Sequence, residues 1–127
     1  MSAKSFVFPI NSLTQANEAF RDEVLTGELS QLVLMTIQPG DDIGEEAHVG
    51  HDQILFFVSG QGEAVIDGQR SPVGPNDLAF VPSGAMHNFI NTGTEPLKLW
   101  TIYAPPEHAA GTRHDTKAEA DAAEHDH

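Results

Sequence analysis

The 127-residue sequence contains no cysteine. This absence excludes disulfide bonds, a thiolate nucleophile and a sulfur-rich metal site such as a structural zinc cluster. Any metal ion that the chain binds must therefore be held by nitrogen and oxygen atoms.

Positive charge is also scarce. Six Lys and Arg residues stand against 19 Asp and Glu residues, which gives a formal net charge of -13. Such a surface repels the phosphate backbone of nucleic acids and the head groups of anionic membranes. We therefore expect neither nucleic acid nor a membrane surface as a partner.

Long hydrophobic runs are missing as well. No segment approaches the roughly 20 apolar residues that a membrane-spanning helix needs. The amino-terminal stretch MSAKSFVFPINS has one lysine and a short apolar run interrupted by Pro9, far less than the apolar region of a signal peptide. We expect a cytoplasmic protein.

What the sequence does contain is the pattern of an all-β domain. Short runs of β-branched, aliphatic and aromatic residues recur at intervals of roughly 8 to 12 residues, separated by glycine, proline and asparagine, and we count about eight strands. Residues 31–37, QLVLMTI, read as a buried strand, and Asp67-Gly68 predicts a hairpin turn. The chain length fits one compact domain.

The chain divides into three regions. We expect residues 1–29 to form an edge strand, FVFPI, and a turn region with a short helical turn, packing on the β-domain of residues 30–104. Residues 105–127 form an acidic tail that contains four of the seven histidines. Thr116 could cap a short helix there with Glu119 at the capping-box position, although the alanines that follow offer little to bury, so the tail is expected to pack loosely.

Four polar residues could share one inward face of the sheets. Glu46 and His48 are two residues apart and point to the same side of an extended strand. Gln53 joins them if the short connection folds the next strand back alongside, and His87 begins a strand after the Pro82-Ser83-Gly84 turn. Buried polar groups are costly unless something pairs with them, and a bound cation would pair with all four. Two imidazoles, one carboxylate and one amide oxygen suit a divalent transition metal such as iron, manganese, nickel, cobalt or zinc.

The same alternation predicts the wall of a pocket. Gln53, Leu55 and Phe57 share one face of their strand, and His87 and Phe89 share one face of theirs. We expect Leu55, Phe57 and Phe89 to line the core or the pocket beside the metal. No lysine or arginine stands at an obvious inward strand position, since Lys98 is expected to face solvent, which makes a sugar phosphate an unattractive substrate.

Other interpretations of these residues remain open. His87 could be a core histidine bonded to a backbone carbonyl, and Glu45 offers an alternative register to Glu46. His51, in the connecting loop, could replace Gln53 as a ligand. The histidines of the tail are expected to be solvated, with at most a weak external metal site.

Two stretches of the sequence resemble motifs of the cupin family. Gly40-x5-Glu46-x-His48-x4-Gln53-x6-Gly60 is similar to the first cupin motif, and Asn76-x5-Pro82-x-Gly84-x2-His87-x3-Asn91 is similar to the second, with fifteen residues between the motifs. The ligand positions depart from the usual pattern at Glu46, where the family has histidine, and at Gln53, where it has glutamate. Asn76 replaces a turn glycine, a mild change because asparagine tolerates left-handed backbone geometry.

The resemblance implies a double-stranded β-helix, or jelly-roll barrel, with one metal near its mouth, held by His48 and His87 together with Glu46 and Gln53. It also implies a homodimer in which the amino-terminal strands extend the sheet of the partner. The function that it implies is that of a small metal-dependent enzyme acting on a small organic molecule, as a dioxygenase, isomerase, lyase or decarboxylase. The alternative is a barrel that binds a ligand or senses a metal without turnover, because the sequence shows no titratable pocket residue beyond the four ligands.

Overall fold

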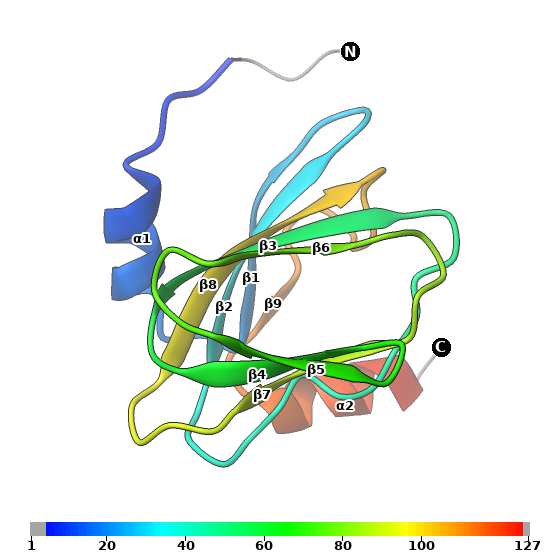
Figure 1. Cartoon of the computed structure of the whole chain (residues 1–127). Coiled ribbons are helices and arrows are strands. Elements are labelled where there is room, and N and C mark those ends of the chain that lie inside the picture. Colours follow the sequence, from blue (N-terminus) through cyan, green and yellow to red (C-terminus); the bar gives the residue numbers. More distant parts are fainter. Residues whose placement is uncertain (1–4, 126–127) are drawn as a thin grey trace.

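The structure, a computed structural model, describes residues 5–125. Its strands form two antiparallel sheets that face each other (Figure 1). The larger sheet has the strand order β6-β3-β8-β2-β1-β9, and the smaller has the order β5-β4-β7. The strands are β1 (Arg21–Thr26), β2 (Gln31–Ile37), β3 (Asp52–Ser59), β4 (Gly62–Ile66), β5 (Gln69–Val73), β6 (Leu78–Val81), β7 (His87–Asn91), β8 (Leu97–Ala104) and β9 (Arg113–His114). The predicted all-β barrel is confirmed.

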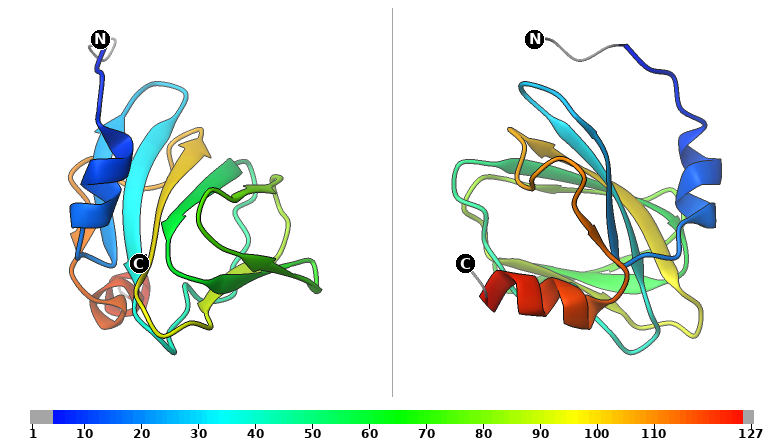
Figure 2. Two further views of the ribbon diagram at one scale, coloured as in Figure 1. Left: turned by 60° about the vertical axis from the view of Figure 1, so that its left-hand side comes forward. Right: turned by 180° about the vertical axis from the view of Figure 1, so that it is seen from behind.

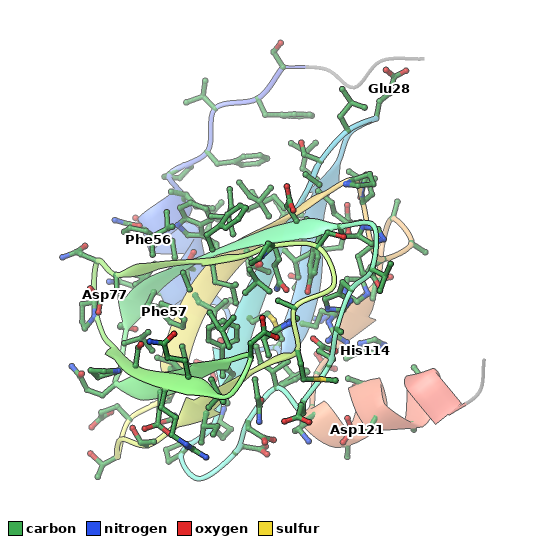
Figure 3. The ribbon with its side chains drawn as sticks, turned by 45° about the vertical axis from the view of Figure 1, so that its right-hand side comes forward. Glu28, Phe56, Phe57, Asp77, His114 and Asp121 are labelled. Atoms are coloured by element: carbon green, nitrogen blue, oxygen red, sulfur yellow. The ribbon has the colours of Figure 1, made fainter. Side chains whose placement is uncertain are left out.

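The core lies between the two sheets because side chains alternate along each strand. In β3, Phe57 points inward and is fully buried, whereas its neighbour Phe56 lies on the outer face and stacks on Trp100 with ring centroids 5.2 Å apart (Figure 3). Phe57 meets Phe89 of the smaller sheet at a centroid distance of 5.8 Å. Burying one such ring stabilises the fold by about 2–3 kcal/mol.

Turn residues adopt the conformations that the sequence predicts. Asp67 and Gly68 both have positive φ angles, 49° and 80°, and they join β4 to β5 as a tight hairpin. Asn76 has a φ of 73°, so it supplies the left-handed conformation at the position where the cupin pattern has glycine.

The amino-terminal region differs from the prediction, because FVFPI forms no strand. Residues 5–9 have no regular structure, and helix α1 covers Ile10–Ala16. The sheet is instead extended by β1, whose sequence RDEVLT begins with three charged residues and did not resemble a strand. Lys98 lies on the outer face of the sheet, but it is half-buried rather than facing solvent, because its ammonium group donates to the carbonyls of Gln15 and Asn17 at the end of α1.

The carboxy-terminal tail is more ordered than predicted. Helix α2 spans Lys117–His125, and Thr116 caps it by accepting a hydrogen bond from the backbone N–H of Glu119 at 3.1 Å. Ala120 is buried against the core, so α2 packs on the barrel rather than fraying away from it (Figure 2). The side chains of Glu124 and His125 and residues 126–127 lie outside the described part of the chain.

One buried side chain fixes the segment that precedes α2. The Oε1 atom of Gln31 accepts from the backbone N–H groups of Glu107 and His108, at 3.1 and 3.0 Å. Its Nε2 atom donates to the carbonyl of His108 at 2.6 Å and to the hydroxyl of Thr26 at 2.7 Å. Gln31 therefore holds Glu107 and His108 at the end of the barrel where the candidate site lies.

Candidate metal centre

Three of the four predicted ligands converge. Glu46, His48 and His87 each offer one ligand atom, and these atoms lie within 4.8 Å of one another. Glu46 and His87 form an antiparallel bridge with backbone N–H···O distances of 2.9 and 2.8 Å, which locks the loop before β3 to the first residue of β7. The imidazole rings of His48 and His87 have centroids 5.3 Å apart.

Both histidines present their Nε2 atoms to this shared point. Nδ1 of His87 lies 2.9 Å from the carbonyl of Ala85, and because a carbonyl only accepts, Nδ1 carries the proton. Nδ1 of His48 lies 3.3 Å from a carboxylate oxygen of Glu107, which fixes the same tautomer. The Nε2 atoms of both rings are buried and have no hydrogen-bond partner outside the cluster, within which Oε1 of Glu46 lies 3.1 Å from Nε2 of His48. His87 can therefore bond to the backbone carbonyl through Nδ1 and still bind a metal through Nε2. The two interpretations of this residue are compatible.

Glu46 supplies the negative charge of the cluster. Its Oε1 atom lies 3.1 Å from Nε2 of His48 and 3.9 Å from Nε2 of His87. Burial raises the pKa of Glu46, but the adjacent His48, with the charges of His87 and Arg21, outweighs burial and leaves the pKa below its ordinary value. Burial lowers the pKa of His48, yet the Glu46 and Glu107 carboxylates outweigh it and the pKa is raised. A proton and a metal cation therefore compete for the same nitrogen.

Gln53 contributes a free amide oxygen to the same interior. Its Nε2 atom donates to the hydroxyl of Thr101 at 3.0 Å, and this hydroxyl in turn donates to the carbonyl of Ile54. The amide orientation is thereby fixed, and Oε1 is left buried without a partner. Gln53 pairs with Tyr103 across β3 and β8, and the Tyr103 ring meets His48 edge-on at 5.6 Å. Gln53 as a fourth ligand stays a prediction.

His51 does not offer a lone pair to the cluster. Its Nδ1 atom lies 2.7 Å from the carbonyl of Pro105, and its Nε2 atom lies 2.9 Å from Oε2 of Glu107. Both nitrogens of His51 are thus engaged by groups outside the metal cluster. This geometry argues against His51 as the replacement for Gln53, and Glu45, which is exposed, lies outside the cluster.

The donor set fits a divalent transition metal. Two imidazole nitrogens and one carboxylate oxygen converge, their remaining polar atoms are held by hydrogen bonds, and the buried Nε2 atoms and the Gln53 oxygen lack protein partners. Buried polar groups without partners are rare in proteins, and those at functional sites often await an ion or ligand. The Glu107 contact with His48 is the kind of supporting carboxylate that orients a metal-bound histidine.

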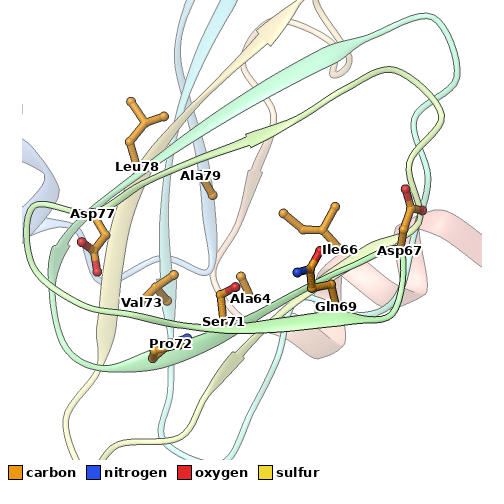
Figure 4. A pocket seen from close by; sticks show the side chains of 10 residues that line it. All are labelled: Ala64, Ile66, Asp67, Gln69, Ser71, Pro72, Val73, Asp77, Leu78 and Ala79. Atoms are coloured by element: carbon orange, nitrogen blue, oxygen red, sulfur yellow. The ribbon is translucent and has the colours of Figure 1, made fainter.

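The predicted pocket residues belong to the hydrophobic core, and their role as a pocket wall stays a prediction. Leu55, Phe57 and Phe89 are fully buried members of the hydrophobic core, and the Phe89 ring lies 6.0 Å from that of His87. A groove of about 560 Å³ runs between the smaller sheet and β6 (Figure 4). Ile66, at one end of this groove, is the cross-strand neighbour of His87, so the groove approaches the candidate metal centre from one side.

Comparison with known proteins agrees with this geometry. Residues 33–103 match the Cupin_2 family model, a cupin domain. The chain belongs to the cupin family. It is 44% identical over 128 residues to the uncharacterized protein YrkC of Bacillus subtilis, which covers 95% of this chain and 68% of YrkC. The crystal structure of BH2720 from Bacillus halodurans superposes with a TM-score of 0.92 and 42% identity, covering 94% of this chain and 95% of that one.

A more distant neighbour is the crystal structure of a predicted oxalate decarboxylase from Thermotoga maritima. It shares 25% identity at a TM-score of 0.59, covering 62% of this chain and 69% of that chain. No helix between residues 5 and 125 of this cupin is long and apolar enough to cross a membrane.

Sequence reasoning missed four residues around the cupin site. Arg21 in β1 pairs with the inward-facing Met35 and is buried, so the expectation of no inward lysine or arginine was wrong. Glu107 contacts His48 and His51, and the Tyr103 ring lies against both His48 and His108. The Nε2 atom of His108 is buried, so the prediction that this tail histidine is solvated was wrong. The only available signal was the density of histidine and glutamate directly after β8.

Proposed function

We propose that this cupin binds one divalent transition metal through Glu46, His48 and His87, with Gln53 as a further oxygen ligand, and acts as an enzyme on a small organic molecule. The observation that carries the proposal is the convergence of two unpartnered Nε2 atoms and one carboxylate oxygen within 4.8 Å. The metal, when bound, supplies a Lewis acid that polarises an oxygen of the substrate or binds oxygen.

The residues of the chain do the rest. His48 and His87 keep their Nε2 lone pairs available because Glu107 and Ala85 hold the opposite nitrogens. Leu55, Phe57 and Phe89 exclude water from the side of the site that faces the core. Glu107 bridges His48 and His51, which fixes the position of both side chains beside the site.

The non-catalytic alternative loses part of its support. It rested on the absence of a titratable pocket residue beyond the four ligands. Glu107 and His108 are such residues in the segment that Gln31 fixes in place, and His51 is another, in the loop before β3. The similarity to a predicted oxalate decarboxylase supports small organic acids, oxalate among them, as the first substrates to examine.

Elemental analysis of protein purified without added metal tests the metal assignment. We expect close to one transition metal per chain in the wild type and a loss of most of it in His87→Ala and Glu46→Gln. Glu45→Gln is the matched control, because it removes the exposed carboxylate next to Glu46 and should keep the metal. Metal-free wild-type protein that gains no melting temperature with any of the five candidate metals would refute the proposal.

Turnover is tested separately on metal-loaded protein. Incubation with a panel of small organic acids, followed by NMR of the products, should reveal a reaction that His87→Ala abolishes. Binding of these acids without any product would instead support the ligand-binding or sensing barrel.

A further inference from the structure

Arg21 is a buried guanidinium that forms no ion pair with any acidic side chain that the structure describes, although its charge acts on Glu46 from farther away. Its side chain points to the same face of the sheet as its cross-strand neighbour Met35, and the residue is 4% exposed. None of the ion pairs found among residues 5–125 involves Arg21. A buried charge without a partner destabilises a fold by several kcal/mol, which makes this arrangement costly unless an anion completes it.

The other cations of the described chain are arranged differently. Arg70 pairs with Glu63, Arg113 pairs with Asp22 and Asp115, and Lys117 pairs with Asp42 and Asp121. Lys98 donates to two backbone carbonyls. Among the acidic side chains that the structure describes, none lies in ion-pair contact with Arg21, the most deeply buried guanidinium.

One edge of the Arg21 guanidinium is left open. Nη1 lies 3.2 Å from Nδ1 of His114, and the guanidinium carbon lies 5.4 Å from the centroid of the Phe20 ring. Nε is buried and has no hydrogen-bond partner, and no hydrogen bond from Nη2 occurs within the described residues. Nε and Nη2 together form the fork that binds the two oxygens of one carboxylate.

A cavity of about 230 Å³ lies beside this residue. Arg21, Glu107, His108, Thr112 and His114 line it, and Ala120 and Ala123 of α2 close one side. The Nε2 atom of His108, also without a partner, is a second unpaired polar atom among these residues. One water molecule takes up about 30 Å³ in the liquid, so the cavity has room for several water molecules or for an acid of a few carbon atoms.

We infer that this cavity is a binding site for the carboxylate group of a small organic acid, which the Nε and Nη2 atoms of Arg21 hold as a bidentate pair.

The charges of the cavity favour a carboxylate over a phosphate. Arg21 provides one positive charge, and Glu107 contributes a carboxylate to the lining, which opposes a dianion. Burial and the nearby Arg21 lower the pKa of His108 to about 4, so this imidazole is neutral at pH 7 and adds no second positive charge. The one guanidinium of the cavity therefore matches a ligand with one negative charge better than a dianionic phosphate. The inference goes beyond the proposed metal chemistry and does not require it.

NMR titration of chelator-treated, metal-free protein tests the site directly. Acetate, propionate and inorganic phosphate serve as probes in a buffer without carboxylates, and the Nε–H resonance of Arg21 is followed. We expect saturable shifts of this resonance with the carboxylates and weaker ones with phosphate. Because the readout is on wild-type protein, it does not depend on any variant folding.

Two variants supply the comparison. Arg21→Gln should weaken carboxylate binding by about tenfold or more, while Arg70→Gln, which alters an exposed arginine, should leave it unchanged. Arg21→Gln should also melt no lower than the wild type in the absence of ligand, since it removes an unpaired buried charge. A purely structural arginine would show the opposite.

Several results would overturn the inference. They are an Arg21 resonance that does not respond, equal binding by Arg21→Gln, a preference for phosphate, or binding that requires metal and ignores Arg21. The last outcome would place the anion on the metal and leave the proposed function standing. Failure to bind metal would leave the Arg21 site untouched, because the titration uses metal-free protein.

Discussion

A carboxylate oxygen of Glu107 lies 3.3 Å from Nδ1 of His48, although Glu107 belongs to the segment that follows the last long strand. The other oxygen lies 2.9 Å from Nε2 of His51. A residue outside both cupin motifs thus sets the orientation of a histidine inside the first one.

We expect Glu107→Gln to weaken metal binding by about 10- to 100-fold, the range found when a supporting carboxylate of a metal-bound histidine is removed. Competition with a chelator of known affinity measures the change. The exposed Glu45→Gln is the control and should keep wild-type affinity. An unchanged affinity in Glu107→Gln would mean that Glu107 does not orient His48.

Gln31 should matter for stability as much as a core residue does. Gln31→Leu keeps the size of the side chain but leaves the N–H groups of Glu107 and His108 and the carbonyl of His108 without their partner. We expect the free energy of unfolding to fall by about 2–4 kcal/mol, since each buried unsatisfied group costs about 1–3 kcal/mol.

Urea unfolding followed by circular dichroism measures this loss. Gln69→Leu, on the exposed side of β5, is the matched control and should change the stability by less than about 0.5 kcal/mol. If Gln31→Leu is as stable as that control, the segment carrying Glu107 is held by other contacts.

The outer face of the larger sheet bears on the expected homodimer. Leu78 and Phe80 on the edge strand β6 are 59% and 52% exposed, and they lie beside the stacked Phe56 and Trp100 rings. An apolar patch of this kind often marks a protein interface. The dimer stays a proposal, and its expected amino-terminal strand has no counterpart at residues 5–9.

Light scattering during size-exclusion chromatography should give about twice the 13.7 kDa mass of one chain. Phe80→Asp should shift the wild-type protein to a monomer, because a charge would be buried in the interface. Leu29→Asp, on the β1–β2 turn, should leave the mass unchanged. A monomeric wild type would remove the dimer without affecting the metal site.

The sequence predicted most of the barrel because strand alternation and turn chemistry are local. The 31–37 strand, the Asp67-Gly68 hairpin and the left-handed Asn76 each follow from a few adjacent residues. Motif spacing predicted the grouping of Glu46, His48 and His87. The strand assumed at Glu46 and His48 was wrong, because both residues lie in the loop before β3, where only Glu46 forms an isolated bridge to His87.

The residues that were missed act through contacts between distant segments. Arg21 lies in a strand whose other charges concealed its inward position, and Glu107 and His108 reach the site only because Gln31 binds their backbone. No local pattern encodes such a contact. The site therefore has a supporting shell that only the folded chain reveals.

His108 should make the stability of the metal-free protein depend on pH. Burial and the charges of Arg21, His48 and His114 lower its pKa to about 4 from an ordinary value of 6.5, against a smaller opposing effect of Glu46. Between these two values the unfolded chain binds a proton that the folded chain does not, so stability falls as the pH drops from about 6.5 to 4.

The difference between wild type and His108→Gln isolates this effect from the titration of the carboxylates. We expect the wild type to lose about 1–2 kcal/mol more than the variant between pH 7 and pH 4, a value reduced for the partial exposure of His108. Urea unfolding at several pH values measures it. Parallel curves for the two proteins would mean that His108 binds protons equally in both states.

The exchange of residues at positions 46 and 53 offers a final test of the metal centre. The double variant Glu46→His with Gln53→Glu restores the usual cupin pattern. Its ligand set has three imidazoles and one carboxylate, where the wild type has two imidazoles, one carboxylate and one amide oxygen. We expect the double variant to retain close to one metal per chain. Glu46→His alone leaves no carboxylate among the ligands and should bind the metal at least about tenfold more weakly, because a negative ligand is lost. Elemental analysis and chelator competition distinguish these outcomes. If the double variant binds no metal while the wild type does, then position 53 does not face the ion, and Gln53 is not a ligand.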